Sequence, residues 1–350
     1  MYARERNITT KLLAAALTLV LSASCSSIDD DLSDCDTDYK LDYELRLVTN
    51  MTTELETQLS TQTELGLAQA LRQHLEKIFT DYAHDVDLSF YDTEGAMSRL
   101  QHDQHIMDAN QASYTLYLPM RQYMHLAAAN LLENNLVALT GDDRCPTAVL
   151  KQEVRDTISS HTTGLFTARQ PMEVLSGVDQ TFNVHLYMAN CAAGLVIDPR
   201  NEDIKDIKVY STGFASQFNI NDSTFVFSPQ SPIVRTDVVK AEDTNELCYC
   251  SVTFPSKEPS IPTRSVIETT EPFVSPYAED ALWQFRAYVT KKDGSVTQTI
   301  LGIHRPLRAG QLMIIKGHLT SDGAVETHDP TVGVSVTLDW SPGHSETVPL

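Results

Sequence analysis

The sequence lacks the short motifs by which many enzymes bind phosphate or hold a nucleophile. It has no Walker loop and no GxGxxG pattern, so no glycine-rich loop is available for a nucleotide. It also has no GxSxG, so Ser211-Thr212-Gly213 and the scattered histidines do not form a nucleophile elbow. No pair of carboxylates stands out as an acid and a base. We therefore expect a protein that is not an enzyme and needs no cofactor.

Metal-binding patterns are missing as well. There is no CxxC pair and no zinc-site spacing of cysteines. His102-Asp103-Gln104-His105 has an HxxH spacing with Asp108 nearby, and two histidines with a carboxylate can hold zinc. This segment is polar and lies between predicted strands. We interpret it as a solvated loop and expect no metal site.

Long apolar runs are absent after the N-terminus. The first apolar run, residues 12–21, is itself too short to span a bilayer, which needs about 20 apolar residues. It follows a basic segment and ends in small residues before Cys25, as export signals do. Leu21 stands four residues before the cysteine, and Ser22 takes the place where bacterial lipoproteins usually have leucine. We predict a lipoprotein signal peptide at residues 1–24 and acylation (palmitate) of Cys25; the alternative is an ordinary secretory signal that ends near a cysteine.

Basic residues are scarce: 26 Lys and Arg stand against 47 Asp and Glu, for a formal net charge of −21. A surface with this charge repels nucleic acid, so we expect no nucleic-acid partner. Residues 25–36 contain the run Asp29-Asp30-Asp31 and are interpreted as an acidic tether, since like charges repel and stay extended. A cysteine followed by a short acidic run also resembles the surface-export signal of Bacteroidetes lipoproteins. Both interpretations place the folded part outside a membrane.

Six cysteines occur, and acylation of Cys25 would leave five. Cys35 and Cys145 lie in polar surroundings, the second of them in a predicted loop, and an exported protein can form disulfides. A Cys35–Cys145 bridge is therefore one possible disulfide. Cys191 is predicted to be a small buried hydrophobe. Cys248 and Cys250 are two apart on a predicted strand, a spacing of roughly 6.6 Å, so we expect them not to bond each other.

Hydrophobic periodicity predicts a mostly β protein with one helix. Residues 39–47 alternate between apolar and polar, as a half-buried strand does. Residues 63–82 change to a helical period, which predicts an amphipathic helix packed on a sheet. Further strands are predicted at Val86–Tyr91, Ser113–Leu118 and Tyr123–Ala129.

The chain is long enough for two domains, because removal of residues 1–24 leaves 326 residues. A polar stretch favours a boundary near residue 165, with an N-terminal β-sandwich domain at 37–165 that holds the helix and a C-terminal one at 166–350. Short extended runs separated by turn residues indicate the second sandwich. Those runs are 182–188, 193–197, 207–210, 224–227, 234–239, 248–254, 283–290, 297–303, 311–319 and 332–340. The alternating Val332, Val334, Val336 and Leu338 form one face with Trp340, and we expect that face to fill the core of the second domain.

Several stretches together resemble the fimbrillin-associated anchor lipoproteins of Bacteroidales, the FimB-like anchor subunits of type V pili. The start resembles them in Cys25…IDDDLSDCD followed by YKLDYELRL, and VDLSFYDTEG resembles their strand-plus-turn pattern. SYTLYLPMRQYMHLAAANL resembles their "LP-x-G-x-Y" stretch, with Arg121 where the family usually has glycine. AGQLMIIKGHLTSDG and VGVSVTLDW resemble their closing hairpin.

The resemblance implies two tandem transthyretin-like β-sandwich domains of Greek-key type. It implies a structural anchor at the fimbrium base, held to the outer membrane by its lipid and bound to a fimbrillin shaft subunit by β-strand complementation. Shaft subunits of such pili lose an N-terminal strand to a protease that cuts after Arg or Lys. Here Lys40 and Arg46 lie inside the predicted first strand, so we expect that strand to stay and the fibre to end at this subunit. The alternative is a surface-exposed carbohydrate-binding or adhesive lipoprotein, although Trp283 and Trp340 lie in strand patterns typical of core.

Overall fold

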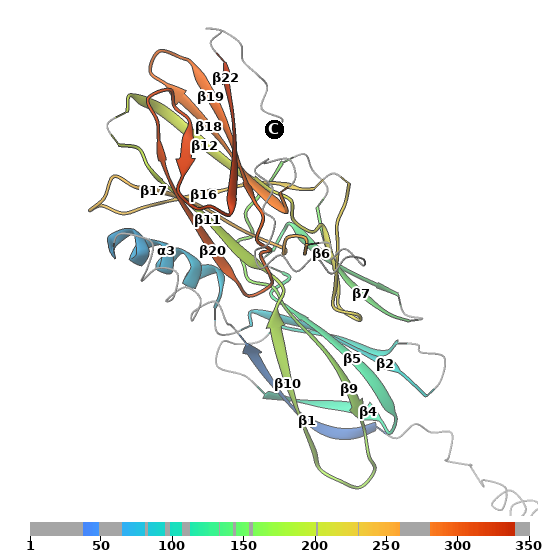
Figure 1. Cartoon of the computed structure of the whole chain (residues 1–350). Coiled ribbons are helices and arrows are strands. Elements are labelled where there is room, and N and C mark those ends of the chain that lie inside the picture. The colour runs from blue at the N-terminus through green and yellow to red at the C-terminus, as the bar shows by residue number, and fades with distance from the viewer. Residues whose placement is uncertain are drawn as a thin grey trace, which may run out of the picture.

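The computed structural model describes residues 38–48, 65–80, 83–94, 99–106, 113–132, 134–142, 145–153, 157–200, 202–229, 231–259 and 281–339. These residues are mostly β, as predicted, and form four sheets and the helix α3 (Leu65–Ile78). Figure 1 shows a lower body built on one sheet and an upper body that contains two further sheets and α3.

The lower body is a seven-stranded sheet with the order β3-β2-β5-β9-β10-β1-β4. Its strands are β1 (Asp38–Val48), β2 (Asp85–Asp92), β3 (Arg99–Ile106), β4 (Ser113–Pro119), β5 (Gln122–Ala129), β9 (Phe166–Glu173) and β10 (Gln180–Met188). The predicted strands at β1, β2, β4, β5 and β10 are confirmed. The predicted loop around His102 and His105 is wrong, because these residues belong to β3. Strand β3 lies at the edge of the sheet, where a strand pairs on one side and tolerates a polar sequence. Its hydrophobic periodicity is therefore too weak to predict a strand.

The upper body packs a five-stranded sheet on a six-stranded sheet. The first has the order β16 (Asp237–Lys240), β17 (Leu247–Thr253), β11 (Cys191–Asp198), β20 (Leu312–Leu319) and β21 (Val325–Thr327). The second has the order β22 (Val332–Asp339), β19 (Val296–Ile303), β18 (Trp283–Lys291), β12 (Ile204–Thr212), β15 (Ile233–Arg235) and β8 (Thr157–Ser159). The core between them contains Trp283, which is fully buried as predicted, whereas Trp340 lies outside the described residues.

A four-stranded sheet with the order β14 (Thr224–Val226), β13 (Gln217–Asn219), β7 (Cys145–Gln152) and β6 (Val137–Asp142) lies beside the junction of the two bodies (Figure 1). Its core includes Phe218 and Leu150 and continues into Leu126 of β5 and Phe254, which follows β17. Cys145 begins β7, so its predicted place in a loop is wrong.

Helix α3 packs on a sheet, as its periodicity predicted, but that sheet belongs to the upper body. Its neighbours are β16 and β17, and the buried Leu67, Leu71 and Leu75 share a core with residues that include Cys248 and Ile314. The five-stranded sheet is consequently buried on both faces, by α3 on one side and by the six-stranded sheet on the other. The helix precedes β2 in the sequence and yet covers strands that come more than a hundred residues later.

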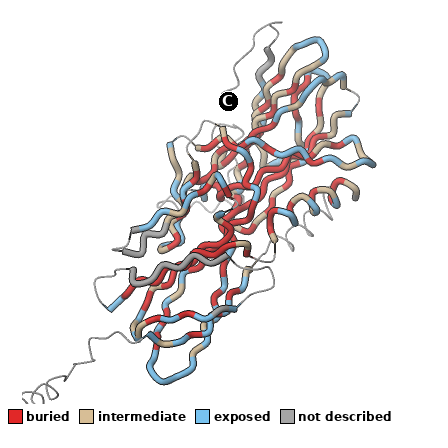
Figure 2. Tube along the Cα trace, turned by 180° about the vertical axis from the view of Figure 1, so that it is seen from behind, coloured by how far each residue is buried: buried red, intermediate tan, exposed pale blue. Residues whose placement is uncertain are grey.

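The strand pairing crosses residue 165 in both directions. Strands β9 and β10 follow that position and join the lower sheet. Strands β7 and β8 precede it and pair with β13 and β15 of the later chain, and β6 joins the same sheet through β7. The division into 37–165 and 166–350 therefore stays a prediction, and a cut at that point would separate paired strands. Figure 2 shows buried residues running through the junction of the two bodies without interruption.

Two predictions about the late strands need correction. The run 234–239 belongs to two strands. Its first part is in β15, which pairs with β12, and after Thr236 the chain enters β16, which pairs with β17 in the other sheet. Two of the valines of β22 do not fill the core, because Val334 is 37% exposed and Val336 is 41% exposed, whereas the partly buried Val332 packs against it as predicted. They share a sheet face with the buried Leu301, but β22 is an edge strand and the nearby β21 is three residues long, too short to cover it.

Candidate functional site: the first strand and its groove

Strand β1 is held on both sides in the seven-stranded sheet. It pairs in parallel with β10 from Leu41–Gln180 to Val48–Tyr187, and antiparallel with β4 from Asp38–Pro119 to Glu44–Ser113. Its alternation sends Leu41, Tyr43 and Leu45 into the core at 6% exposure or less. The strand therefore fills a groove between β10 and β4.

The basic residues Lys40 and Arg46 lie within β1, as predicted, with their side chains exposed. The backbone at Lys40 pairs with Tyr117 of β4, and that at Arg46 pairs with His185 of β10. Proteases favour exposed, flexible segments, so a paired strand is a poor substrate. This geometry agrees with the prediction that β1 is retained.

Tyr43 and His125 join β1 to β5 through the core of the lower body. The Tyr43 hydroxyl lies 2.7 Å from His125 Nε2, and His125 Nδ1 lies 3.1 Å from the Ser89 carbonyl oxygen. Because a carbonyl can only accept, Nδ1 donates to Ser89 and Nε2 accepts from the Tyr43 hydroxyl. The His125 ring also stacks on Phe90, with centroids 4.4 Å apart.

His125 is neutral at physiological pH in this arrangement. Burial lowers the pKa of its imidazole from 6.5 to about 4, more than the Ser89 hydrogen bond raises it. Protonation would turn Nε2 into a donor, which could no longer accept a hydrogen bond from the Tyr43 hydroxyl. No local pattern in the sequence reveals this pair, because its members are 82 residues apart.

Arg121, which replaces the glycine usual in the resembling family, has a clear role in the turn between β4 and β5. Its Nη1 donates to Asp92 Oδ2 at 2.8 Å, and Asp92 Oδ1 accepts from the Glu94 amide at 2.9 Å. The Asp92 side chain is 4% exposed and that of Arg121 is 31% exposed. This ion pair connects the end of β2 to the turn that leads from β4 into β5.

The predicted site residues are only partly described by the structure. Cys25 and Cys35 lie outside the described residues, so lipidation and a Cys35–Cys145 bridge stay predictions. Cys191, Cys248 and Cys250 are free and buried, which confirms both expectations for them. Burial raises the pKa of the Cys248 thiol to about 12 and raises those of the other two thiols as well.

A cleft of about 340 Å³ opens where the chain crosses between the upper sheets. It is lined by Ile207, Lys208, Val209, Tyr210, Arg235, Thr236, Val238 and Tyr249. Tyr210 and Tyr249 are 6% and 3% exposed, so neither offers the open ring face on which a sugar could stack. Burial, with a smaller effect of Asp206, raises the pKa of the Tyr249 hydroxyl.

Within the described ranges, no group of three or more His, Cys, Asp or Glu side chains is placed to hold a metal ion. Among those same residues, no helix is both long enough and apolar enough to cross a membrane.

Comparison with known proteins gives one family match. The profile of the family described as fimbrillin-A associated anchor proteins Mfa1 and Mfa2 matches residues 35–246, more than half of the chain. A comparison with curated proteins finds no match.

Several solved structures are similar to this chain at low sequence identity. The fimbrial anchor protein Mfa2 from Porphyromonas gingivalis is 11% identical, with 86% of this chain and 97% of that chain covered and a TM-score of 0.46. A candidate adhesin from Bacteroides ovatus is 11% identical, with coverages of 88% and 96% and a TM-score of 0.49. A candidate polysaccharide-binding protein from Bacteroides thetaiotaomicron is also 11% identical, with coverages of 86% and 95% and a TM-score of 0.49.

Proposed function

The chain belongs to the family of the fimbrillin-A associated anchor proteins Mfa1 and Mfa2, and from that membership we propose that it is the anchor subunit of a fimbrium. This family consists of fimbrial structural proteins and is not a family of enzymes. In our proposal, Cys25 carries the lipid, residues 25–36 form the tether, and the folded body lies on the outer surface of the outer membrane. The subunit holds the fimbrial shaft and ends its assembly.

The position of β1 is the observation that carries this proposal. A lipid at Cys25 can hold the body only if no protease cuts the chain within the strand that follows the tether. Strand β1 begins thirteen residues after Cys25 and is paired along both sides within the seven-stranded sheet. A filled groove cannot accept a strand from a further subunit, which supports a subunit that ends the fibre.

The shaft subunit is proposed to bind by β-strand complementation at β22. This strand pairs only with β19 among the described strands, and its outer side is a sheet edge. Val334 and Val336 leave apolar surface exposed there, next to the core. An extended segment that adds to a sheet edge gains main-chain hydrogen bonds and side-chain pockets, as in other cases of strand addition. A long apolar edge without a partner also invites aggregation, so a partner for β22 is expected.

The membrane part of the proposal is tested by cell fractionation of a Cys25→Ala variant. We expect the protein and its attached fimbriae in the medium, because stable anchoring needs the acyl chains. Cys35→Ser is the matched control, since it changes a nearby cysteine and leaves the acylation site intact. Fimbriae that remain on cells with Cys25→Ala would contradict the anchoring role.

The shaft interface is tested by Val334→Lys, which places a charge on the exposed edge. Val178→Lys is the control, because Val178 is 57% exposed in the turn before β10, which belongs to a different sheet from β22. Each variant is purified under native conditions from fimbriated cells. Fimbrillin should be recovered together with the Val178→Lys control and not with Val334→Lys. Equal recovery would place the shaft interface elsewhere.

A further inference from the structure

The direction of β1 and β10 determines how this protein carries tension. Both strands run the same way, with Leu41 opposite Gln180 and Val48 opposite Tyr187. The tether joins the first end of β1, near Gln180. Strand β10 continues from its other end, after Met188, into β11 of the upper body. A pull between the tether and the upper body therefore loads two parallel strands at opposite ends, which is a shearing geometry.

We propose that β1 is a mechanical clamp: its parallel ladder with β10, locked by the Tyr43–His125 hydrogen bond, carries the tension between the membrane tether and the upper body in shear. In shear, the hydrogen bonds of the ladder lie across the force and share it, so they must fail together. In peeling, they would fail one after another. The eight pairs from Leu41–Gln180 to Val48–Tyr187 bear the load along one side of β1, and the β4 ladder resists on the other.

The passage from β10 to β11 is stiff enough to transmit this force. Only Ala189 and Asn190 separate the strands, and both are buried. The Ala189 amide donates to the Leu165 carbonyl oxygen at 2.8 Å, and the Asn190 carbonyl oxygen accepts from the Gly310 amide at 2.7 Å. The Asn190 side chain adds bonds to the Leu165 amide and to His161. Tension on β10 thus reaches the central strand of the five-stranded sheet without a flexible link.

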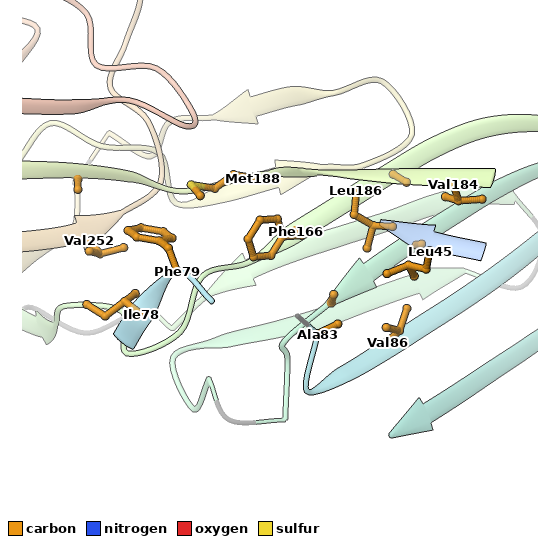
Figure 3. Close-up of a cluster of buried hydrophobic side chains, with 14 of the residues drawn as sticks. Leu45, Ile78, Phe79, Ala83, Val86, Phe166, Val184, Leu186, Met188 and Val252 are labelled. Carbon is orange, nitrogen blue, oxygen red and sulfur yellow. The ribbon is translucent and has the colours of Figure 1, made fainter. Parts of the chain in front are cut away.

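Apolar packing couples β1 to the same path. Leu45 of β1 shares a core with Val184 and Leu186 of β10, and that core continues through Phe166 and Phe79 to Val252 of β17. Figure 3 shows these side chains arranged in a row from Leu45 to Val252. Extraction of β1 would expose Leu41, Tyr43 and Leu45 together, so the lower body resists its removal as a unit.

Helix α3 gives a second point of attachment behind the clamp. If β1 is pulled out, the next described element along the chain is α3, which packs on β16 and β17 of the upper body. The 27 residues from Asp38 to the residue before Leu65 are then released, which is at most about 97 Å of extended chain. The tether would still be joined to the upper body through the buried face of α3.

The test is single-molecule force spectroscopy on the chain from residue 25 onward, with Cys25, Cys35 and Cys145 changed to Ser. One handle is fused to the N-terminus. The other is attached to a single introduced cysteine, either Lys292→Cys in the exposed turn after β18 or Val178→Cys in the exposed turn before β10. The three remaining cysteines are buried and stay unlabelled in the folded chain. The first handle pair shears β1 against β10, and the second pair pulls both strands from the same end and peels them apart.

We expect the first rupture with the handle at Lys292→Cys to need several-fold more force than with the handle at Val178→Cys. This rupture should release no more chain than residues 38–64, which precede α3. Tyr43→Phe should lower the shear force, whereas the matched Tyr117→Phe, an exposed tyrosine on the neighbouring β4, should not. Equal forces in the two geometries, or release of the whole lower body in one step, would overturn the clamp. An unchanged force with Tyr43→Phe would overturn the lock.

This inference rests on the proposed anchoring function for the source of the tension. The force measurement uses purified protein without lipid or shaft, so it reports on the clamp alone. A weak clamp would leave the fractionation result of Cys25→Ala unchanged, and failure of that fractionation would leave the measured forces unchanged.

Discussion

The His125–Tyr43 pair should make the lower body sensitive to mild acid. The pKa of His125 is lowered to about 4 in the folded protein, from 6.5 in the unfolded chain. Between these two values the unfolded chain takes up a proton that the folded protein does not bind. The free energy of unfolding therefore falls as the pH falls below 6.5, and this contribution levels off below pH 4.

The size of the effect follows from the two pKa values. One pKa unit corresponds to about 1.4 kcal/mol, so His125 contributes a loss of about 2 kcal/mol on going from pH 7.5 to pH 5. Burial lowers the pKa of His161 to about 4 in the same way. The many carboxylates of this acidic chain also make the free energy of unfolding depend on pH. Only a comparison of variants can isolate the contribution of His125.

The comparison uses His125→Gln, because a glutamine can donate to Ser89 and accept from Tyr43 without titrating. His185→Gln is the control, since His185 is exposed on the neighbouring β10. Hydrogen exchange of β1 peptides, corrected for the intrinsic effect of pH, measures the opening free energy of this strand.

The parent protein and His185→Gln should lose about 2 kcal/mol more opening free energy between pH 7.5 and pH 5 than His125→Gln loses. If all three proteins lose the same amount, then His125 does not control the acid response of β1. A larger loss in His125→Gln would mean that the imidazole is charged in the folded state, opposite to the assignment made from its burial.

Three further outcomes follow from particular contacts. Arg121→Ala should lower the free energy of unfolding of the lower body by about 1–3 kcal/mol, because it removes the Arg121 guanidinium that pairs with the buried Asp92 carboxylate. Hydrogen exchange of β2 peptides measures this loss, and an unchanged exchange rate would contradict it. Gly164→Ala should lower the free energy of unfolding by about 1–3 kcal/mol, because a Cβ at this position would lie 2.7 Å from the Phe79 ring. An unchanged melting temperature would show that the ring moves aside without loss of stability. Mature protein from cells should begin at acylated Cys25, and mass spectrometry that finds an N-terminus inside β1 would show processing like that of a shaft subunit.

Local periodicity was enough to predict most strands and the helix. The alternation of Leu41, Tyr43 and Leu45 with polar neighbours corresponds to their burial in β1, and the helical spacing of Leu67, Leu71 and Leu75 corresponds to the buried face of α3. These patterns depend on which side of an element faces a core. They carry no information about which core it is, and α3 accordingly packs on a sheet that the sequence placed in another domain.

The errors share one cause, which is that pairing partners are not local. Val334 alternates as a buried residue does, but its exposure depends on how far the facing sheet extends, and the facing β21 is short. Residues 234–239 appear continuous, but Thr236 donates through its amide and its hydroxyl to the Val209 carbonyl oxygen, and the chain changes sheets there. The Tyr43–His125 pair, the main feature of the candidate site, is likewise formed by residues far apart in the sequence.

The interleaving of the chain between the two bodies has a consequence for a protein that is pulled from its N-terminus. In a simple tandem of domains, the linker between them would be the sole mechanical connection. Here the chain passes between the bodies repeatedly. Helix α3 lies on the upper body, β2 to β5 return to the lower one, β7 and β8 pair with β13 and β15 of the later chain, and β9 and β10 come back before β11. Each passage is fixed by backbone pairing or by a buried apolar face. Tension that enters at β1 is therefore divided among several connections, and loss of one of them leaves the two bodies joined.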